Sequence, residues 1–157
     1  MNMEIRIVCS RQEAECYLAE LTKLLYENLI VNLPDEEWIV EDASAQAEKL
    51  LLNLDKGNAQ LFVAAENGHL IGFAWTYMRR FAKRQRLHIN HIVVRSDKRG
   101  GGIGKSILSA IIAKASEMNA DAIDLISSKD REDVVRFYIK NGFSVERLQM
   151  IYKLPKA

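Results

Sequence analysis

The segment Val93-Val94-Arg95-Ser96-Asp97-Lys98-Arg99-Gly100-Gly101-Gly102-Ile103-Gly104-Lys105 carries the strongest structural signal in this chain. Four of the eight glycines lie within residues 100–104, after an apolar β-branched run and before the amphipathic run 103–118. This order predicts a strand, a glycine-rich turn and the start of a helix. Such a turn leaves backbone N–H groups free at the positive end of the helix dipole, and glycines let an anion approach closely. The segment therefore predicts a binding site for a phosphate-bearing ligand.

Spacing separates three kinds of phosphate-binding loop. A nucleoside-triphosphate P-loop ending at Gly104 would need a glycine at position 99, where Arg99 stands. The dinucleotide fingerprint Gly-x-Gly-x-x-Gly would need a glycine in place of Lys105 or Ile107, and no βαβ unit opens the chain. The pattern Arg-x-x-Gly-x-Gly is met by Arg99, Gly102 and Gly104. The third kind of loop is therefore the one that fits.

This third pattern resembles the acyl-CoA-binding motif of the GNAT N-acetyltransferase superfamily. Residues 88–94, His-Ile-Asn-His-Ile-Val-Val, resemble the central strand of that family, and residues 137–143, Phe-Tyr-Ile-Lys-Asn-Gly-Phe, resemble its Phe-Tyr-x-x-x-Gly-Phe segment. The resemblance covers about residues 61–143. It implies a mixed α/β fold, with a central, mostly antiparallel sheet flanked by helices, in one domain over residues 1–157.

The resemblance also implies a reaction, the direct transfer of an acetyl group from acetyl-CoA to a primary amine on a small molecule, peptide or protein, without a metal. The CoA pyrophosphate would bind Arg99, Gly100, Gly101, Gly102, Ile103, Gly104 and Lys105. The pantetheine arm would pair with the backbone of Ile92, Val93 and Val94. Arg131 stands where the family often has asparagine, and would reach a CoA phosphate or face solvent. A non-catalytic acyl-CoA sensor is the alternative function.

Four residues are candidates for proton transfer. The resemblance makes Tyr138 the acid for the CoA thiolate, since a neutral phenol can donate a hydrogen bond to sulfur. Histidine can act as a base near neutral pH, so His88 and His91 are candidates, with Asn90 between them. Strand alternation places His88 and Asn90 on one face and His91 on the other unless a bulge intervenes. Either histidine, or an ordered water, remains possible as the base.

The acceptor is less constrained by the sequence. The family often carries Glu or Asp near the central-strand histidines, and their absence here removes support for a polyamine acceptor. Trp75 and Tyr77, two apart on one strand, are candidates for an acceptor pocket, as are Tyr26 and Trp38 on the helices. Aromatic residues at such positions are more often part of the core.

Composition bounds the class of protein. The 157 residues are 48% hydrophobic and 27% charged, with a net charge of +1, which favours one soluble domain and argues against a nucleic-acid binder. Cys9 and Cys16 indicate neither a disulfide framework nor a metal site. The chain shows no signal peptide or membrane span, so we expect a cytoplasmic protein, and a homodimer is possible. The basic residues of segment 79–86 indicate a solvated hairpin turn, or a surface that attracts an acidic partner or the CoA phosphates.

Local patterns predict the remaining elements. We expect strands at residues 4–8, 61–65, 70–78, 87–94, 122–127 and 143–154, and helices at 11–29, 35–54, 103–118 and 130–140. Asn67-Gly68 predicts a tight hairpin. Ser10 predicts a helix cap with Glu13 as its partner, and Asn141-Gly142 predicts a helix stop.

Overall fold

The computed structural model describes residues 2–156 and divides after Ile126 into two compact units. The first unit contains, in chain order, β1 (Met3–Val8), α1 (Arg11–Glu15), α2 (Leu18–Asn32), α3 (Val40–Asp55), β2 (Ala59–Glu66), β3 (His69–Phe81), β4 (Arg84–Val94), the 3₁₀ turn η1 (Ser96–Lys98), α4 (Ile103–Glu117) and β5 (Ala122–Leu125). The second unit contains α5 (Glu132–Lys140).

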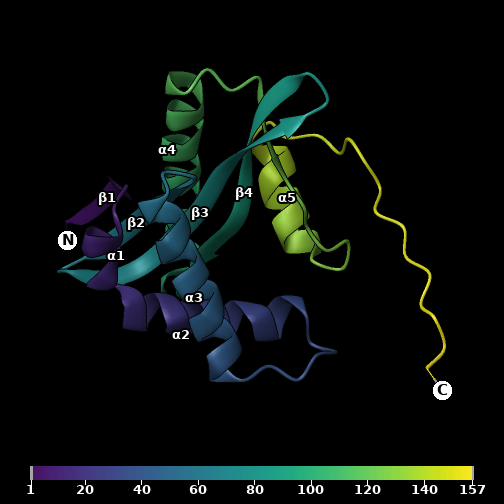
Figure 1. Ribbon diagram of the computed structural model, residues 1–157, viewed down its shortest axis with the longest axis horizontal. Helices are drawn as coiled ribbons and strands as arrows, with labels where there is room; N and C mark the ends of the chain where they lie inside the picture. Colours follow the sequence, from purple (N-terminus) through teal and green to yellow (C-terminus); the bar gives the residue numbers. More distant parts are fainter. Residues whose placement is uncertain (1, 157) are drawn as a thin grey trace. The chain divides into compact units, whose positions relative to one another are not determined.

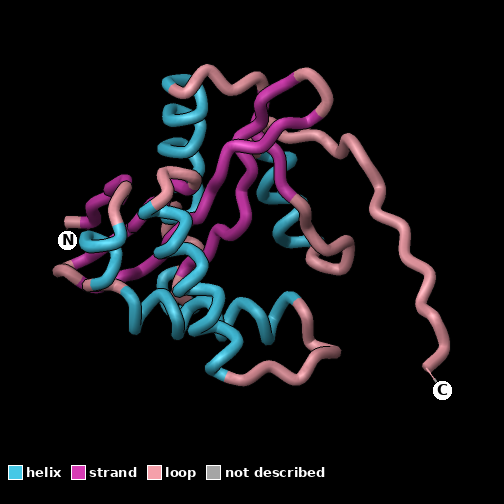
Figure 2. The backbone as a smooth tube through the Cα atoms, viewed as in Figure 1, coloured by secondary structure: helices cyan, strands magenta, loops and turns pink. Residues whose placement is uncertain are grey.

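One five-stranded sheet organises the first unit, in the order β1-β2-β3-β4-β5 (Figures 1 and 2). The first three pairings are antiparallel, and β5 joins β4 in parallel after the crossover through α4. This confirms the predicted fold class, a mixed and mostly antiparallel sheet flanked by helices.

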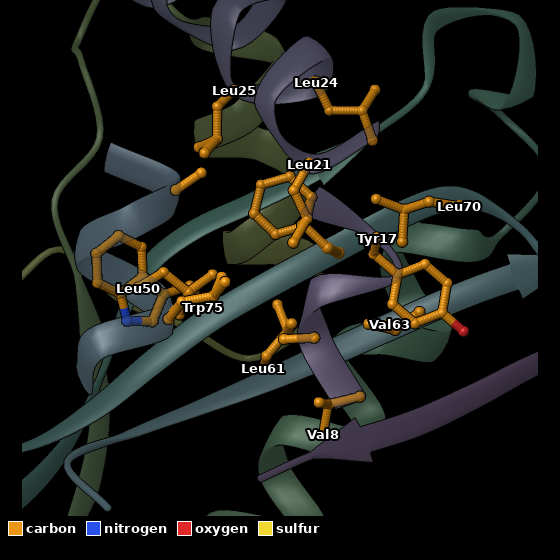
Figure 3. Close-up of a cluster of buried hydrophobic side chains, with 14 of the residues drawn as sticks. Val8, Tyr17, Leu21, Leu24, Leu25, Leu50, Leu61, Val63, Leu70 and Trp75 are labelled. Carbon is orange, nitrogen blue, oxygen red and sulfur yellow. The ribbon is translucent and has the colours of Figure 1, made fainter. Parts of the chain in front are cut away.

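Two apolar layers hold the sheet. Helices α2 and α3 lie side by side (Figure 1), and their leucines pack with Leu61, Phe73 and Trp75 of the sheet in one buried cluster (Figure 3). Helix α4 also packs on the sheet, through a separate set of buried residues that includes Ile103 and Ile107. The strands are therefore buried on both faces, which explains why β2 is a continuous apolar run and does not alternate.

Gly72 of β3 brings the first turn of α4 against the sheet. A Cβ at this position would lie 3.0 Å from the carbonyl oxygen of Val93 and 3.2 Å from Cδ1 of Ile107. Because the backbone and a buried side chain stand there, any larger residue would force α4 away from β4. This glycine thus helps fix where the glycine-rich loop begins the helix.

Two local predictions are confirmed. Asn67 and Gly68 both have positive φ, at 52° and 80°, and close the β2–β3 hairpin. The hydroxyl of Ser10 accepts a hydrogen bond from the Glu13 N–H and caps α1.

The first two helices differ from their predicted limits. The predicted helix 11–29 is interrupted by a turn at Cys16 and Tyr17, which separates α1 from α2. The buried Tyr17 ring joins the core, and Arg6 donates a hydrogen bond to its hydroxyl. The predicted helix 35–54 begins only at Val40, since the Asp42 carboxylate accepts from the Ile39 N–H and caps the helix there.

The strand predicted at 143–154 is wrong. The structure has this segment as loop throughout (Figure 2), with large apolar side chains exposed, Leu148, Met150, Ile151 and Tyr152 among them. Its alternating apolar pattern suits a strand, but a strand requires a neighbour for its hydrogen bonds. Among the described residues of the second unit, α5 is the sole regular element.

Candidate active site

The glycine-rich loop forms an anion site at the start of α4. Gly100 and Gly102 have φ of 81° and 80°, and Gly102 occupies the N-cap without any side-chain cap. The backbone N–H of Ser106 donates to the Gly102 carbonyl at 3.0 Å, so the N–H groups of residues 103–105 precede the first helical hydrogen bond. These N–H groups lie at the positive end of the helix dipole, and both the groups and the dipole favour the binding of an anion.

Ion pairs hold the connection between β4 and α4. Lys98 binds the carboxylate of Glu66 at the far end of β2, and Arg95 binds Asp97 through two nitrogens, at 2.6 and 3.0 Å. Arg99 is exposed, and its Nε donates to the Val94 carbonyl at 3.2 Å. The guanidinium therefore lies where the strand ends and the loop begins.

The edge of β4 that faces β5 opens in the second half of the strand. Strand β5 pairs with residues 86–89 of β4 and no further among the described residues. The Arg95 N–H donates to the Ile71 carbonyl at 2.9 Å, so by antiparallel alternation Val93 bonds to β3, while the amides of Ile92 and Val94 point to the open edge. A flexible ligand with amide groups can pair with these positions as an added strand.

A bulge at Asn90 changes which residues share a face. Trp75 pairs with His91 and Thr76 pairs with Ile89, so Asn90 is the extra residue of β4. Simple alternation would separate the two histidines. The bulge instead places His88 and His91 on the same face, opposite Tyr77 and Trp75 of β3 respectively.

His88 is held by a carboxylate on the neighbouring strand. Its Nδ1 lies 2.7 Å from Oδ1 of Asp124 on β5, and the Tyr77 ring packs against it at 5.1 Å between centroids. A carboxylate only accepts hydrogen bonds, so Nδ1 carries the proton and the Nε2 lone pair is left to accept another. The His88 side chain is only 8% exposed, and this burial helps to fix its orientation.

Two arginines complete the setting of Asp124. Arg79 and Arg86 approach its Oδ2 at 2.7 and 3.3 Å. Burial on its own would raise the pKa of Asp124, but the hydrogen bonds from Arg79 and His88 outweigh it and hold the pKa below its usual range. Asp124 is therefore an anion at neutral pH and a constant partner for the imidazole.

This cluster corrects one sequence interpretation and adds residues that the sequence did not reveal. Arg79 and Arg86 were expected in a solvated turn, but they stand opposite each other on β3 and β4, which continue to a two-residue turn. Asp124 carried no signal, because its pairing with His88 depends on the register of two strands 36 residues apart.

His91 has a different environment. Its ring lies 5.7 Å from that of Trp75, and its Nδ1 is 3.5 Å from the amide nitrogen of Asn28 on α2. Burial lowers the pKa of His91 to about 4. His91 is therefore neutral at physiological pH and a weak base.

The second unit contains Tyr138 and Arg131. Tyr138 on α5 is buried, with the rings of Phe137 and Phe143 at 5.2 Å in edge-to-face contact, and burial raises the pKa of its phenol above the usual range. The hydroxyl thus stays protonated and serves as a hydrogen-bond donor. Arg131 precedes α5 and its Nε lies 3.3 Å from Oδ1 of Asp133.

The predicted aromatic candidates separate into two groups. Trp75 and Tyr77 line a hollow of about 430 Å³ in the first unit. Tyr26 and Trp38 belong to the α2–α3 region, where the Tyr26 hydroxyl lies 3.4 Å from the Trp38 carbonyl and the Trp38 indole donates to Leu33. Neither of the latter two lines the hollow.

Residues 2–156 lack two other kinds of feature, a membrane-spanning helix and a metal-binding cluster. No helix there combines the length and apolar character that crossing a membrane requires. The same residues contain no cluster of three or more His, Cys, Asp or Glu side chains suited to a metal ion.

Comparison with known proteins now defines the class. Residues 19–143 match the Acetyltransferase (GNAT) family, and the chain belongs to this family. Its fold agrees with a putative acetyl transferase from Pyrococcus furiosus, with a TM-score of 0.78 and 24% identity over 98% of this chain and 100% of the other.

Two curated relatives are more specific. A mycothiol acetyltransferase of Propionibacterium freudenreichii subsp. shermanii is 39% identical over 99 residues, which cover 62% of this chain and 32% of the relative. A mycothiol acetyltransferase of Streptomyces coelicolor is 24% identical over 132 residues, 76% of this chain and 42% of the relative. The matched regions thus span well under half the length of either relative.

Proposed function

We propose that this chain transfers an acetyl group from acetyl-CoA to a primary amine. The observation that carries the proposal is the continuity of the open β4 edge with the glycine-rich start of α4. The N–H groups of residues 103–105 would bind the CoA pyrophosphate, beside the side chain of Arg99 and with Lys105 near. The amides of the pantetheine arm would then pair with Ile92 and Val94.

We assign the base to His88. A base must be unprotonated and must present a lone pair to the incoming ammonium. Asp124 holds the proton of His88 on Nδ1 and leaves Nε2 for the substrate. His91 is a poor alternative, because burial lowers its pKa to about 4 and such a group accepts a proton weakly at neutral pH.

We assign Tyr138 the role of hydrogen-bond donor to the leaving sulfur. Its pKa, raised by burial, makes full ionisation costly, so its contribution is to stabilise the thiolate as negative charge develops on it. Arg131 is an additional candidate for a CoA phosphate, in competition with its contact to Asp133.

The proposed acetyl transfer begins with removal of a proton from the acceptor and ends with the amide and CoA. Nε2 of His88 takes a proton from the acceptor ammonium, and the neutral amine attacks the thioester carbonyl carbon. The new N–C bond forms, the C–S bond breaks, and the electron pair of that bond leaves on sulfur. A proton from the attacking nitrogen reaches sulfur with the Tyr138 hydroxyl hydrogen-bonded to it, which gives the amide and CoA.

The test compares His88→Gln with His91→Gln in an assay of amine-dependent CoA release. We expect a loss of about 10²-fold or more in kcat for His88→Gln, because general bases contribute that much, and a much smaller change for His91→Gln. Equal losses, or a larger loss for His91→Gln, would overturn the assignment of the base. Tight acetyl-CoA binding without release to any amine would instead favour the non-catalytic sensor.

A further inference from the structure

Two arginines stand directly opposite each other towards the hairpin end of β3 and β4. Arg79 pairs with Arg86 in the antiparallel register. Like charges at directly opposed positions of a sheet destabilise it, and a sequence that breaks such a local rule does so most often at a functional or strained site. The two guanidiniums therefore need a common partner, and Asp124 of β5 provides it.

The carboxylate of Asp124 divides its two oxygens between different partners. Oδ2 accepts hydrogen bonds from Nη2 of Arg79 at 2.7 Å and from Nη1 of Arg86 at 3.3 Å. Oδ1 lies 2.7 Å from Nδ1 of His88. One oxygen thus binds the arginines, and the other holds the imidazole of the proposed base.

Arg79 has the shorter and longer-reaching of the two arginine contacts. Strand β4 lies between β3 and β5, so the Arg79 side chain crosses β4 to reach Asp124. The Arg86 guanidinium also packs over the Phe81 ring, with its central carbon 4.1 Å from the ring centroid. The Arg79 side chain is 36% exposed, against 11% for Arg86. Replacement of Arg79 should therefore disturb the packing less than replacement of Arg86.

Asp124 depends on such contacts for its orientation. The terminal torsion of an aspartate is broad and roughly two-fold, so its own rotamer preference does not fix the plane of the carboxylate. Strand β5 has four residues and pairs with β4 alone among the described residues, so it gives little further support. Charge-assisted hydrogen bonds to Oδ2 are strong and directional, and they fix that plane.

We propose that Arg79 is a positioning residue for the acetyl transfer. By holding Oδ2 of Asp124, it keeps Oδ1 on Nδ1 of His88, so that the proton stays on Nδ1 and the lone pair of Nε2 faces the acceptor. Arg79 acts through Asp124 and touches neither the base nor the reacting atoms. This inference rests on the proposed function and adds a residue to it, from a segment whose charges suggested only a solvated turn or a docking surface.

The tautomer of His88 tests the inference without any need for activity. Long-range ¹H–¹⁵N NMR spectra distinguish a protonated from an unprotonated imidazole nitrogen, and His88→Gln assigns the signals. We expect Nδ1 to be the protonated nitrogen in the wild type, and the two nitrogen shifts to move towards each other in Arg79→Met. Arg80→Met is the matched control, because Arg80 is the next residue of β3, is exposed and donates to the Ala82 carbonyl, so it should keep the wild-type pattern.

A double-mutant cycle in the assay of CoA release is the second test. Arg79→Met should lower kcat by about tenfold with an unchanged KM for acetyl-CoA, since only the orientation of the base is lost. Arg79→Lys should restore most of kcat, because an ammonium can also donate to Oδ2. In the Asp124→Asn background, Arg79→Met should lower kcat by less than about twofold further, because residues that act through one another are not additive. Arg79→Gln replaces Arg79→Met in every comparison if the latter does not fold.

The outcomes separate this inference from the proposed function. An unchanged His88 tautomer in Arg79→Met, a loss of kcat equal to that of Arg80→Met, or a loss that adds fully to that of Asp124→Asn would overturn the inference and leave the proposed function intact. Absence of amine-dependent CoA release by the wild type would count against the proposed function. In that case a change of tautomer confined to Arg79→Met would still support the positioning of His88 by Arg79.

Discussion

Lowering the pH should destabilise the fold through His91. Burial lowers the pKa of His91 to about 4 in the fold, against an ordinary value of 6.5 in the unfolded chain. The unfolded chain therefore binds the proton first, and stability falls as the pH drops from about 6.5 towards 4. The whole shift corresponds to about 3 kcal/mol, of which about 2 kcal/mol is lost between about pH 7.5 and pH 5.

Urea unfolding measured over this range, on the wild type and on His91→Gln, isolates the contribution. Glutamine cannot take up a proton. Between these pH values, the free energy of unfolding of His91→Gln should therefore fall by ~2 kcal/mol less than that of the wild type. His69→Gln is the matched control, because the His69 side chain is 74% exposed and pairs with Glu20 at the surface, so this variant should keep the wild-type pH dependence. Staying above pH 5 avoids the protonation of Asp124, whose depressed pKa confines its loss of stability to more acidic solution.

The reasoning fails if His91→Gln shows the same pH dependence as the wild type. That result would mean that His91 titrates normally in the fold. His91 would then be as good a candidate for the catalytic base as His88. The distinction between the two histidines would then have to come from kinetics alone.

Three further predictions concern the site. Asp124→Asn should lower kcat by about 10²-fold, because the amide no longer fixes the His88 tautomer. The control Asp121→Asn, which disturbs only the bond to the Gln85 N–H, should leave kcat nearly unchanged. Similar effects of both variants on kcat would refute a specific role for Asp124. Gly102→Ala and Gly68→Ala share a φ of 80° and a Cβ without neighbours within 4 Å, so each should cost about 1 kcal/mol of stability in denaturant unfolding. Calorimetric titration should find weaker acetyl-CoA binding in Gly102→Ala alone, and equal weakening in both would remove the loop from the CoA site. Tyr138→Phe should slow acetyl transfer by about tenfold or more with nearly unchanged acetyl-CoA affinity, since only the hydroxyl is lost; unchanged turnover would remove Tyr138 from the reaction.

The sequence predicted the parts of the fold that local chemistry determines. The turn at Asn67-Gly68, the cap at Ser10 and the glycine-rich start of α4 each depend on a few adjacent residues, and all three are present. The order of the elements along residues 61–118 followed from the same patterns.

Features that depend on partners distant in sequence were not predictable. The bulge at Asn90 arises from the pairing of β3 with β4, and it brings the two histidines onto one face, where simple alternation had placed them on opposite faces. Asp124 became part of the site only through the β4–β5 register. The apolar segment 143–154 shows the converse, since its pattern suits a strand but the structure has it as loop.

The central claim is the transfer of an acetyl group from acetyl-CoA to an amine, and it is tested most directly by release of the CoA thiol in the presence of a panel of amines. The panel would contain D-glucosamine, cyclohexylamine, spermidine, amino acids, aminoglycosides and short peptides, with mass spectrometry of the acceptor. The account predicts CoA release that depends on one class of amine and is lost in His88→Gln, with one acetyl group added to the amine. Saturable acetyl-CoA binding without amine-dependent release across the panel, or release that His88→Gln leaves unchanged, would contradict it.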